Sequence, residues 1–201
     1  MLKKKVIASS INNLTDARYF AGWMVDYIVF HTDPKNPNYT NPQEIGTFQS
    51  WVEGPQYFFK LADDQFEQLE KILVDLGGHG VSLPYNKRSL IASFDVQSIM
   101  HMTLETFTEG VRNNTLQALN SIVVIENIED IYNLIEPVKA LKSNSAYEGE
   151  IFVELPQNPI SENWVLSPEI DGFLMHGSPE EKVGFKSFDE LDEIFEILQD
   201  F

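Results

Sequence analysis

Short apolar runs alternate with longer amphipathic segments along the whole chain. Runs of β-branched and aromatic residues of this length predict buried strands. Eight such runs are found, at 6–11, 27–31, 57–61, 81–83, 90–96, 122–125, 151–155 and 170–175. Helices are predicted between them, at 13–24, from residue 42, at 63–76, in part of 98–119, at 131–141 and at 188–201. The chain is therefore predicted to alternate strand and helix from end to end.

Local signals mark the starts and ends of several predicted helices. Asn13 is followed by an acid at Asp16, which is typical of a helix N-cap, and Pro42 suits the first turn of a helix. Within 63–76, apolar residues recur every three or four positions, and Gly77 follows as a stop signal.

Strands that alternate with helices imply a parallel sheet with helices on its outside. Eight units of about 25 residues each fall at the short end of the range for a (βα)8 barrel. The sequence therefore predicts one α/β domain over residues 1–201, a minimal TIM barrel. Few residues separate the fourth and fifth runs, so we expect irregularity around strands 4 and 5, near 84–90. An open, doubly wound sheet is the alternative.

The composition fits a folded, water-exposed chain: 43% of the 201 residues are hydrophobic and 22% are charged. No run approaches the ~18 consecutive apolar residues of a membrane span. Behind the lysines at 3–5 the apolar stretch ends at Ser9, too short for a signal peptide, so we expect a cytoplasmic protein with no membrane contact. A monomer or a homodimer is expected.

Acidic residues outnumber basic ones, 31 to 14, and the formal net charge is −17. This balance disfavours nucleic acid as a partner, because Lys and Arg supply most of that affinity. It also disfavours long-range attraction of anions, although a local cluster can still hold a phosphate. The chain has no Cys, which excludes disulfides, thiol nucleophiles, iron–sulfur clusters and cysteine zinc sites. No metal or other cofactor is expected.

Polar residues stand at the predicted carboxyl ends of the strands, where barrel enzymes place their chemistry. They are Ser9, Ser10, His31, Lys60, Asp95, Glu126, Asn127, Glu154 and His176. Closure of strand eight on strand one would place His176, Ser9 and His31 on three adjacent strands.

A serine beside a histidine suggests a hydrolase, in which imidazole takes the hydroxyl proton and an acid orients the ring. No Gly-x-Ser-x-Gly elbow surrounds Ser9 or Ser10. The same side chains could instead hold a metal, but no His-x-His or His-Glu-x-x-His spacing is present. His79 and His101 are interpreted as loop and helix-surface residues without a functional signal.

The chain resembles phosphoribosylanthranilate isomerase, a small (βα)8 enzyme of tryptophan biosynthesis, over nearly its whole length. The family's first strand and helix read Lys-Ile-Cys-Gly-Ile-Thr-Asn-Leu-x-Asp-Ala, and residues 9–17 align with Cys to Ala without a gap. After strand two the family has Pro-Arg-Tyr-Val-x-Pro, where this chain has residues 37–42. Residues 176–180 and 184–187 loosely match the family's Ser-Gly-Val-Glu and Gly-x-Lys-Asp.

The departures fall on the residues to which the family gives catalytic roles. The family's Amadori rearrangement uses a Cys thiolate as base and a carboxylic acid as proton donor. The Cys position is Ser9, whose hydroxyl is almost never ionised. The acid after strand six is Glu126 instead of Asp, and the Arg that holds the anthranilate carboxylate is Asn38. Lys35, in the same loop, is a candidate replacement for that Arg.

The phosphate-binding part of the family pattern is also incomplete. The family has a Gly-rich turn after strand seven, whereas residues 153–157 contain no glycine and include Pro156. The strand-eight turn keeps Gly177 and Ser178, which would preserve half of the site.

Taken together, the resemblance implies an isomerase-like barrel with an altered base, carboxylate clamp and phosphate loop, and not an efficient isomerase. Ser9, Glu126 and His176 are the candidate catalytic residues. The candidate ligands of a small sugar phosphate are Lys35, Asn38, His31, Lys60, Gly177 and Ser178. Two alternatives stay open: a non-catalytic barrel that binds a metabolite or a protein, and a working isomerase in which His176 activates Ser9 and Lys35 replaces the Arg.

Overall fold

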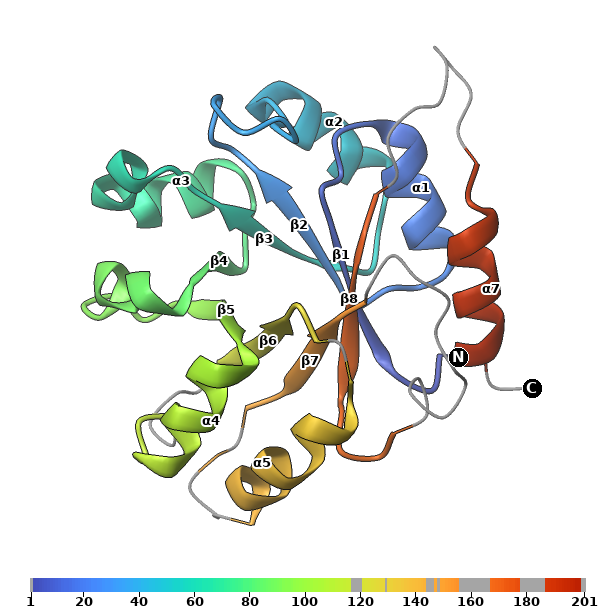
Figure 1. The fold of residues 1–201 in the computed structure, drawn as a ribbon. Helices are drawn as coiled ribbons and strands as arrows, with labels where there is room; N and C mark the ends of the chain where they lie inside the picture. Colours follow the sequence, from blue (N-terminus) through green and yellow to red (C-terminus); the bar gives the residue numbers. More distant parts are fainter. Residues whose placement is uncertain are drawn as a thin grey trace.

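Eight parallel strands form a closed barrel in chain order, β1 to β8, with helices around it (Figure 1). This computed structural model describes residues 2–116, 121–128, 130–143, 147, 149–155, 167–177 and 187–199. Closure is direct, because β1 pairs with β8 in parallel and Ser9 stands beside His176 in the register. The predicted barrel is confirmed, and the open sheet is wrong.

The strands are short and mostly buried on both sides. They are β1 (Lys5–Ser9), β2 (Tyr27–His31), β3 (Gln56–Lys60), β4 (Gly80–Pro84), β5 (Gln97–Thr103), β6 (Ile122–Glu126), β7 (Ile151–Glu154) and β8 (Gly172–His176). A strand that is covered by the barrel interior on one side and by helices on the other consists mainly of apolar residues. Polar residues near the carboxyl ends of these strands are therefore exceptions to the apolar pattern.

The helices cover the outer face of the barrel. They are α1 (Leu14–Gly22), α2 (Pro42–Trp51), the 3₁₀ helix η1 (Asp63–Gln68), α3 (Leu69–Asp75), the 3₁₀ helix η2 (Tyr85–Ile91), α4 (Leu104–Arg112), α5 (Tyr132–Lys142) and α7 (Asp189–Leu198). The predicted caps are confirmed: the Asn13 side chain accepts from the Asp16 N–H, and Pro42 lies in the first turn of α2. Among the described residues, no helix is long and apolar enough to cross a membrane.

The connection between β4 and β5 differs from the prediction. Residues 90–96 are not a strand, because the chain after β4 forms η2 and places Ile91 in the core. The fifth strand, Gln97–Thr103, overlaps the start of the segment 98–119, which is predicted to be partly helical. The expected irregularity is thus a 3₁₀ helix in place of an α-helix. The barrel itself is complete here, since β4 and β5 pair over five residues.

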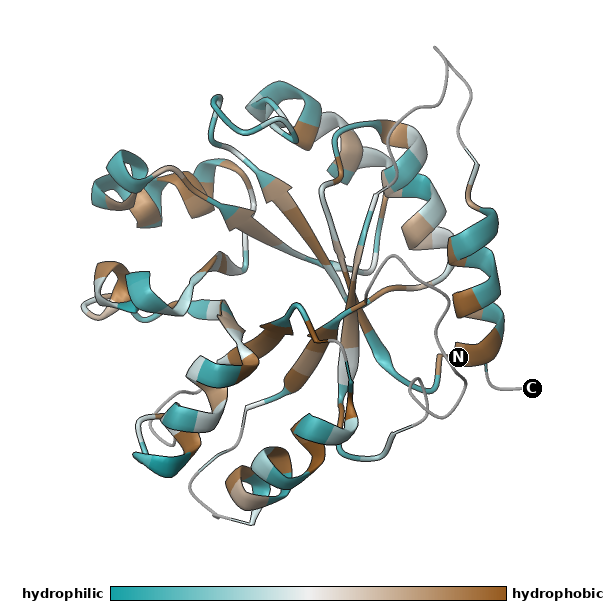
Figure 2. Ribbon diagram, in the orientation of Figure 1, coloured by the Kyte–Doolittle hydropathy of each residue, from teal (hydrophilic) through white to brown (hydrophobic). Residues whose placement is uncertain are grey.

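Two apolar layers make up the core. In Figure 2 the strands are coloured largely as hydrophobic. The larger lies between strands and helices and includes Phe20, Phe59 and Phe195. The smaller fills the barrel and consists of Ile7, Tyr27, Val29, Phe58, Ile99, Val124, Phe152 and Leu174. Because strand side chains alternate, the residue two positions after the last inner-core residue of each strand points inward at the carboxyl end of the barrel.

Candidate functional site

A ring of polar residues occupies the barrel's carboxyl end, which we call the mouth. Each strand contributes one: Ser9, His31, Lys60, Ser82, His101, Glu126, Glu154 and His176. Seven lie two positions after a residue of the inner core, and Ser82 follows the buried Gly80 in the same way. The apolar filling therefore ends one layer below the mouth. Active sites of (βα)8 enzymes lie at this end of the barrel.

Ser9 and His31 form the first of three serine–histidine contacts at the mouth. Ser9 Oγ lies 3.3 Å from His31 Nε2, and both residues are buried. His31 Nδ1 has no hydrogen-bond partner among the described residues. Burial, aided by the charge of Lys60, lowers the pKa of His31 to about 4. His31 is therefore neutral at pH 7.

A second contact continues to a carboxylate and joins β1, β8 and β7. Ser10 Oγ lies 3.0 Å from His176 Nδ1, and His176 Nε2 lies 2.7 Å from Glu154 Oε1. Asn38 Nδ2, from the β2–α2 loop, donates to Ser10 Oγ at 3.1 Å. Ser10 directly follows β1 and has a φ of 60°, in the left-handed region. We refer to Ser10, His176 and Glu154 as the Ser10 set.

The third contact joins β4, β5 and β6 and contains the same residue types. Ser82 Oγ lies 2.7 Å from His101 Nε2, and His101 Nδ1 lies 2.9 Å from Glu126 Oε1. The hydrogen bond from His101 lowers the pKa of Glu126 against the opposing effect of burial, so this carboxyl group is ionised at pH 7. We refer to these three residues as the Ser82 set.

His101 is a correction to the sequence interpretation, which assigned it to a helix surface. It is 8% exposed and points inward from β5. Ser82 was not identified either, because a single serine inside a short apolar run resembles a packing residue. Asp95 does not end a strand; it is exposed and precedes β5. One signal that would have found His101 is its place two residues after the inward-facing Ile99.

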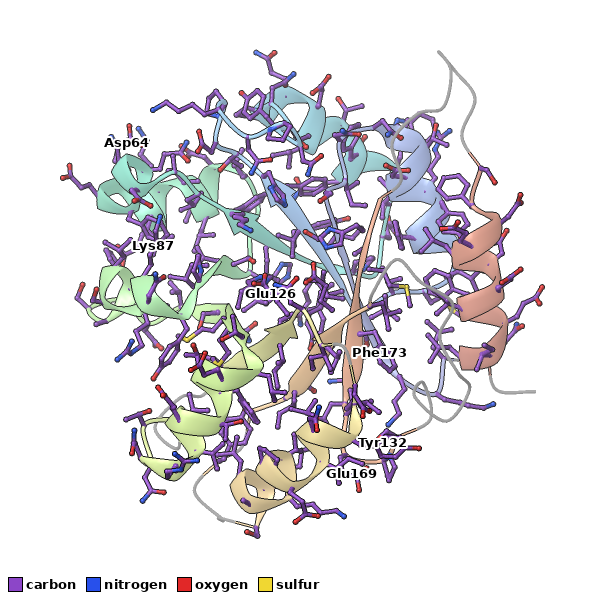
Figure 3. The ribbon with its side chains drawn as sticks, viewed as in Figure 1. Asp64, Lys87, Glu126, Tyr132, Glu169 and Phe173 are labelled. Atoms are coloured by element: carbon purple, nitrogen blue, oxygen red, sulfur yellow. The ribbon has the colours of Figure 1, made fainter. Side chains whose placement is uncertain are left out.

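A cavity of about 810 Å³ lies beside the mouth, over the segments that follow β2, β3 and β4. Its charged lining residues are three lysines and three aspartates: Lys35, Lys60, Lys87, Asp33, Asp63 and Asp64. Lys87 Nζ is paired with Asp63 Oδ1 at 2.5 Å. Among the described residues, the ammonium groups of Lys35 and Lys60 have no hydrogen-bond or ion-pair partner. In Figure 3, Lys87 and Asp64 lie toward the outside of this region, and Glu126 lies near the centre of the mouth.

The other predicted ligand residues fall beside the Ser10 set. Gly177 donates its N–H to the Ser9 carbonyl at 2.9 Å and packs closely against the turn after β1. A Cβ at Gly177 would lie 2.7 Å from Asp16 Oδ2 and 3.0 Å from the Ser10 carbonyl oxygen, so only glycine fits without a shift. Asn127 follows Glu126 in a left-handed conformation. Ser178 and residues 156–157 lie outside the described residues.

The ring consists largely of side chains that can take up or release protons. Within the part of the chain that the structure describes, no three His, Asp or Glu side chains are grouped as metal ligands. The mouth offers neutral imidazole at His31, two imidazole–carboxylate pairs and an unpaired ammonium at Lys60. Such groups suit acid–base chemistry on a small polar molecule.

Comparisons with known proteins identify solved structures that share the fold of this chain. Neither a scan of protein-family models nor a sequence search of curated proteins gave a match. Solved structures of phosphoribosylanthranilate isomerase are similar over the full length. The enzyme from Thermotoga maritima has a TM-score of 0.73 at 13% identity, covering 96% of both chains.

Two further structures indicate how far the likeness extends. Phosphoribosylanthranilate isomerase in complex with reduced 1-(o-carboxyphenylamino)-1-deoxyribulose 5-phosphate has a TM-score of 0.73 at 13% identity, covering 97% of this chain and 98% of that one. 3-Dehydroquinate dehydratase from Geobacillus kaustophilus has a TM-score of 0.61 at 10% identity, covering 97% and 91%. At these identities the comparison shows a shared fold, and function has to be argued from the site.

Proposed function

We propose that this chain is a phosphoribosylanthranilate isomerase-like barrel that binds a small sugar-phosphate-type anion at its mouth and is not an efficient phosphoribosylanthranilate isomerase. The observation that carries the proposal is the unpaired ammonium of Lys60, which lines a cavity at the carboxyl end of the barrel. An ionised group without a partner in a partly enclosed site favours a ligand of opposite charge.

The cavity can attract an anion although the whole chain is acidic. Its lining carries three lysines and three aspartates, but among the described residues only Lys87 is paired, with Asp63, and the ammonium groups of Lys35 and Lys60 have no ion-pair partner. Charge–charge attraction acts over about 8 Å at physiological ionic strength, so an anion beside Lys60 is screened from the distant surface acids. The related isomerase structure whose ligand is a ribulose 5-phosphate derivative supports a sugar phosphate as the ligand class.

Weak isomerase activity follows from the state of the two residues at the family's catalytic positions. Ser9 would need a strong base to ionise, but its neighbour His31 has a pKa of about 4 and accepts a proton poorly. Glu126 would need to be protonated to act as an acid, but His101 keeps its carboxyl group ionised at pH 7. Neither the base nor the acid is in the form that the rearrangement requires.

Calorimetric titration with ribose 5-phosphate, beside ribose as the uncharged reference, tests binding. We expect Lys60→Gln to weaken ribose 5-phosphate binding by about tenfold or more, the usual value of a charge-assisted hydrogen bond. Lys87→Gln is the matched control, because it removes the same charge from the same cavity but from a residue already paired with Asp63. Equal losses in the two variants, or equal binding of ribose, would contradict the proposal.

Isomerase activity is measured separately by generating phosphoribosylanthranilate in situ and following the loss of its fluorescence. We expect no turnover above buffer at high protein concentration. Turnover that Glu126→Ala abolishes would instead establish a working isomerase and show that the Ser9 position is compatible with catalysis.

A further inference from the structure

The Ser10 set plays no part in the anion site proposed above, yet its contacts are those of an activated serine. The hydroxyl, the imidazole and the carboxylate form a continuous line, with separations of 3.0 Å and 2.7 Å. The three residues come from the ends of β1, β8 and β7, so rigid neighbouring strands hold them.

The carboxylate decides which imidazole nitrogen is free to act as a base. Glu154 Oε1 can only accept a hydrogen bond when ionised, so His176 Nε2 must carry the proton that it donates. Nδ1 of the neutral ring then has a lone pair, and the partner that this lone pair faces is the Ser10 hydroxyl. Glu154 thus fixes the tautomer in which His176 can accept the Ser10 proton.

The backbone at Ser10 supports a role beyond packing. Its φ of 60° lies in a region that costs most side chains about 1 kcal/mol or more. The family motif to which this segment is similar has glycine at this position, so a hydroxyl replaces the residue that best tolerates the conformation. The turn also lifts Oγ out of the strand and toward Asn38 Nδ2, which donates to it.

We propose that Ser10 is the nucleophile of a second activity, the hydrolysis of small, uncharged carboxylic esters. Ser10 Oγ attacks the carbonyl carbon while its proton moves to His176 Nδ1. The bond to the leaving alcohol oxygen breaks and that oxygen takes the proton from Nδ1, which leaves an acyl-serine. Water then attacks the acyl carbon, Nδ1 takes the proton from the water, and Ser10 Oγ recovers it as the carboxylic acid departs.

The choice of an uncharged ester follows from the charge around the site. Glu154 is a carboxylate at the mouth, and the chain carries a formal net charge of −17. Both disfavour an anionic acyl group at Ser10. Ser10 itself is only 8% exposed, whereas the side chain of His176 is 45% exposed. A short acyl group suits a serine that is so little exposed.

Labelling with a fluorophosphonate probe, read by intact mass and by mapping of the modified peptide, tests the nucleophile. We expect one label on Ser10 and none above background in Ser10→Ala. Ser10→Gly is a second variant that removes the hydroxyl together with the strained side chain, so loss of label there does not reflect misfolding. Ser82→Ala is the matched comparison, since Ser82 has the same neighbours but is 1% exposed.

The rate of p-nitrophenyl acetate hydrolysis, measured as kcat and KM, tests the esterase activity. We expect kcat/KM to fall about 100-fold in Ser10→Ala and in His176→Ala, the usual effect of removing a nucleophile or its base. Glu154→Gln acts through the ring, so we expect kcat to fall about tenfold with KM within twofold. Retention of label in folded Ser10→Gly, or its loss in Ser82→Ala alone, would overturn the proposal. Failure of ribose 5-phosphate to bind would leave it unaffected.

Discussion

The Ser10 set and the Ser82 set contain the same three residue types on opposite sides of one barrel mouth. In each, a serine contacts a histidine and the histidine contacts a glutamate on the neighbouring strand. They differ in surroundings. Ser82 lies within the regular strand β4 and is 1% exposed, and its partner His101 is 8% exposed. Ser10 lies just beyond β1 in a left-handed turn and is 8% exposed, and the side chain of His176 is 45% exposed.

This difference teaches that a serine–histidine–glutamate contact is not by itself a catalytic site. In the Ser82 set the hydrogen bonds satisfy polar groups that the fold has already buried, which is a structural requirement. In the Ser10 set the serine is 8% exposed, but the side chains of His176 and Glu154 are 45% and 25% exposed, so water would satisfy these two equally well. The backbone, more than the residue types, separates a packing role from a chemical one.

The largest expected effect is on stability and separates the two histidines. His101→Ala should lower the free energy of unfolding by about 3 kcal/mol, because it leaves a cavity and removes the partners of a buried hydroxyl and a half-buried carboxylate. His176→Ala should cost about 1 kcal/mol or less, since water replaces its contacts. Urea unfolding of both variants measures the difference, and equal losses would mean that the two sets are not distinguished by burial.

The Ser9–His31 contact differs from the other two because no carboxylate among the described residues contacts its histidine. His31 is buried, and its pKa of about 4 lies below the ordinary value of 6.5. Between these values the unfolded chain binds a proton that the folded chain does not, so stability falls as the pH is lowered through this window. From pH 7 to pH 5 we expect this residue to reduce the free energy of unfolding by about 2 kcal/mol.

Urea unfolding at pH 7 and pH 5 checks this expectation, with His31→Gln as the control. The variant has no titrating ring at this position, so its loss between the two pH values should be about 2 kcal/mol smaller than that of the wild type. Parallel losses in the two proteins would show that His31 titrates normally in the folded state.

The sequence predicted the barrel because seven of its eight strands are marked by apolar runs, and β5 is the instructive exception. Gln97–Thr103 carries polar residues among its apolar ones, and this mixture resembles an amphipathic helix. The inward-facing polar residue that hid the strand, His101, is also a residue of the mouth. The polar residue that the mouth requires is therefore also the one that weakens the strand signal at this position.

The candidate site was predictable to the extent that it depends on strand ends. Ser9, His31, Lys60, Glu126, Glu154 and His176 follow from the rule that strand carboxyl ends meet. This rule did not predict which of these side chains hydrogen-bond to one another. His176 contacts Ser10 instead of Ser9 because of the left-handed turn after β1. A pair of serines does not predict that backbone conformation.

The smallest expected effect tests the backbone difference itself. Ser10→Gly and Ser10→Ala both remove the hydroxyl and differ by a single Cβ. At a φ of 60° we expect the glycine variant to be more stable by about 1 kcal/mol. The same pair at Ser82, within β4, should have the opposite sign, because glycine in a strand interior is less stable than alanine by about 0.5–1 kcal/mol. Unfolding of the four variants in urea gives both differences. An equal sign at the two positions would remove backbone strain as the feature that distinguishes the Ser10 set, and exposure alone would then have to account for any reactivity of its serine.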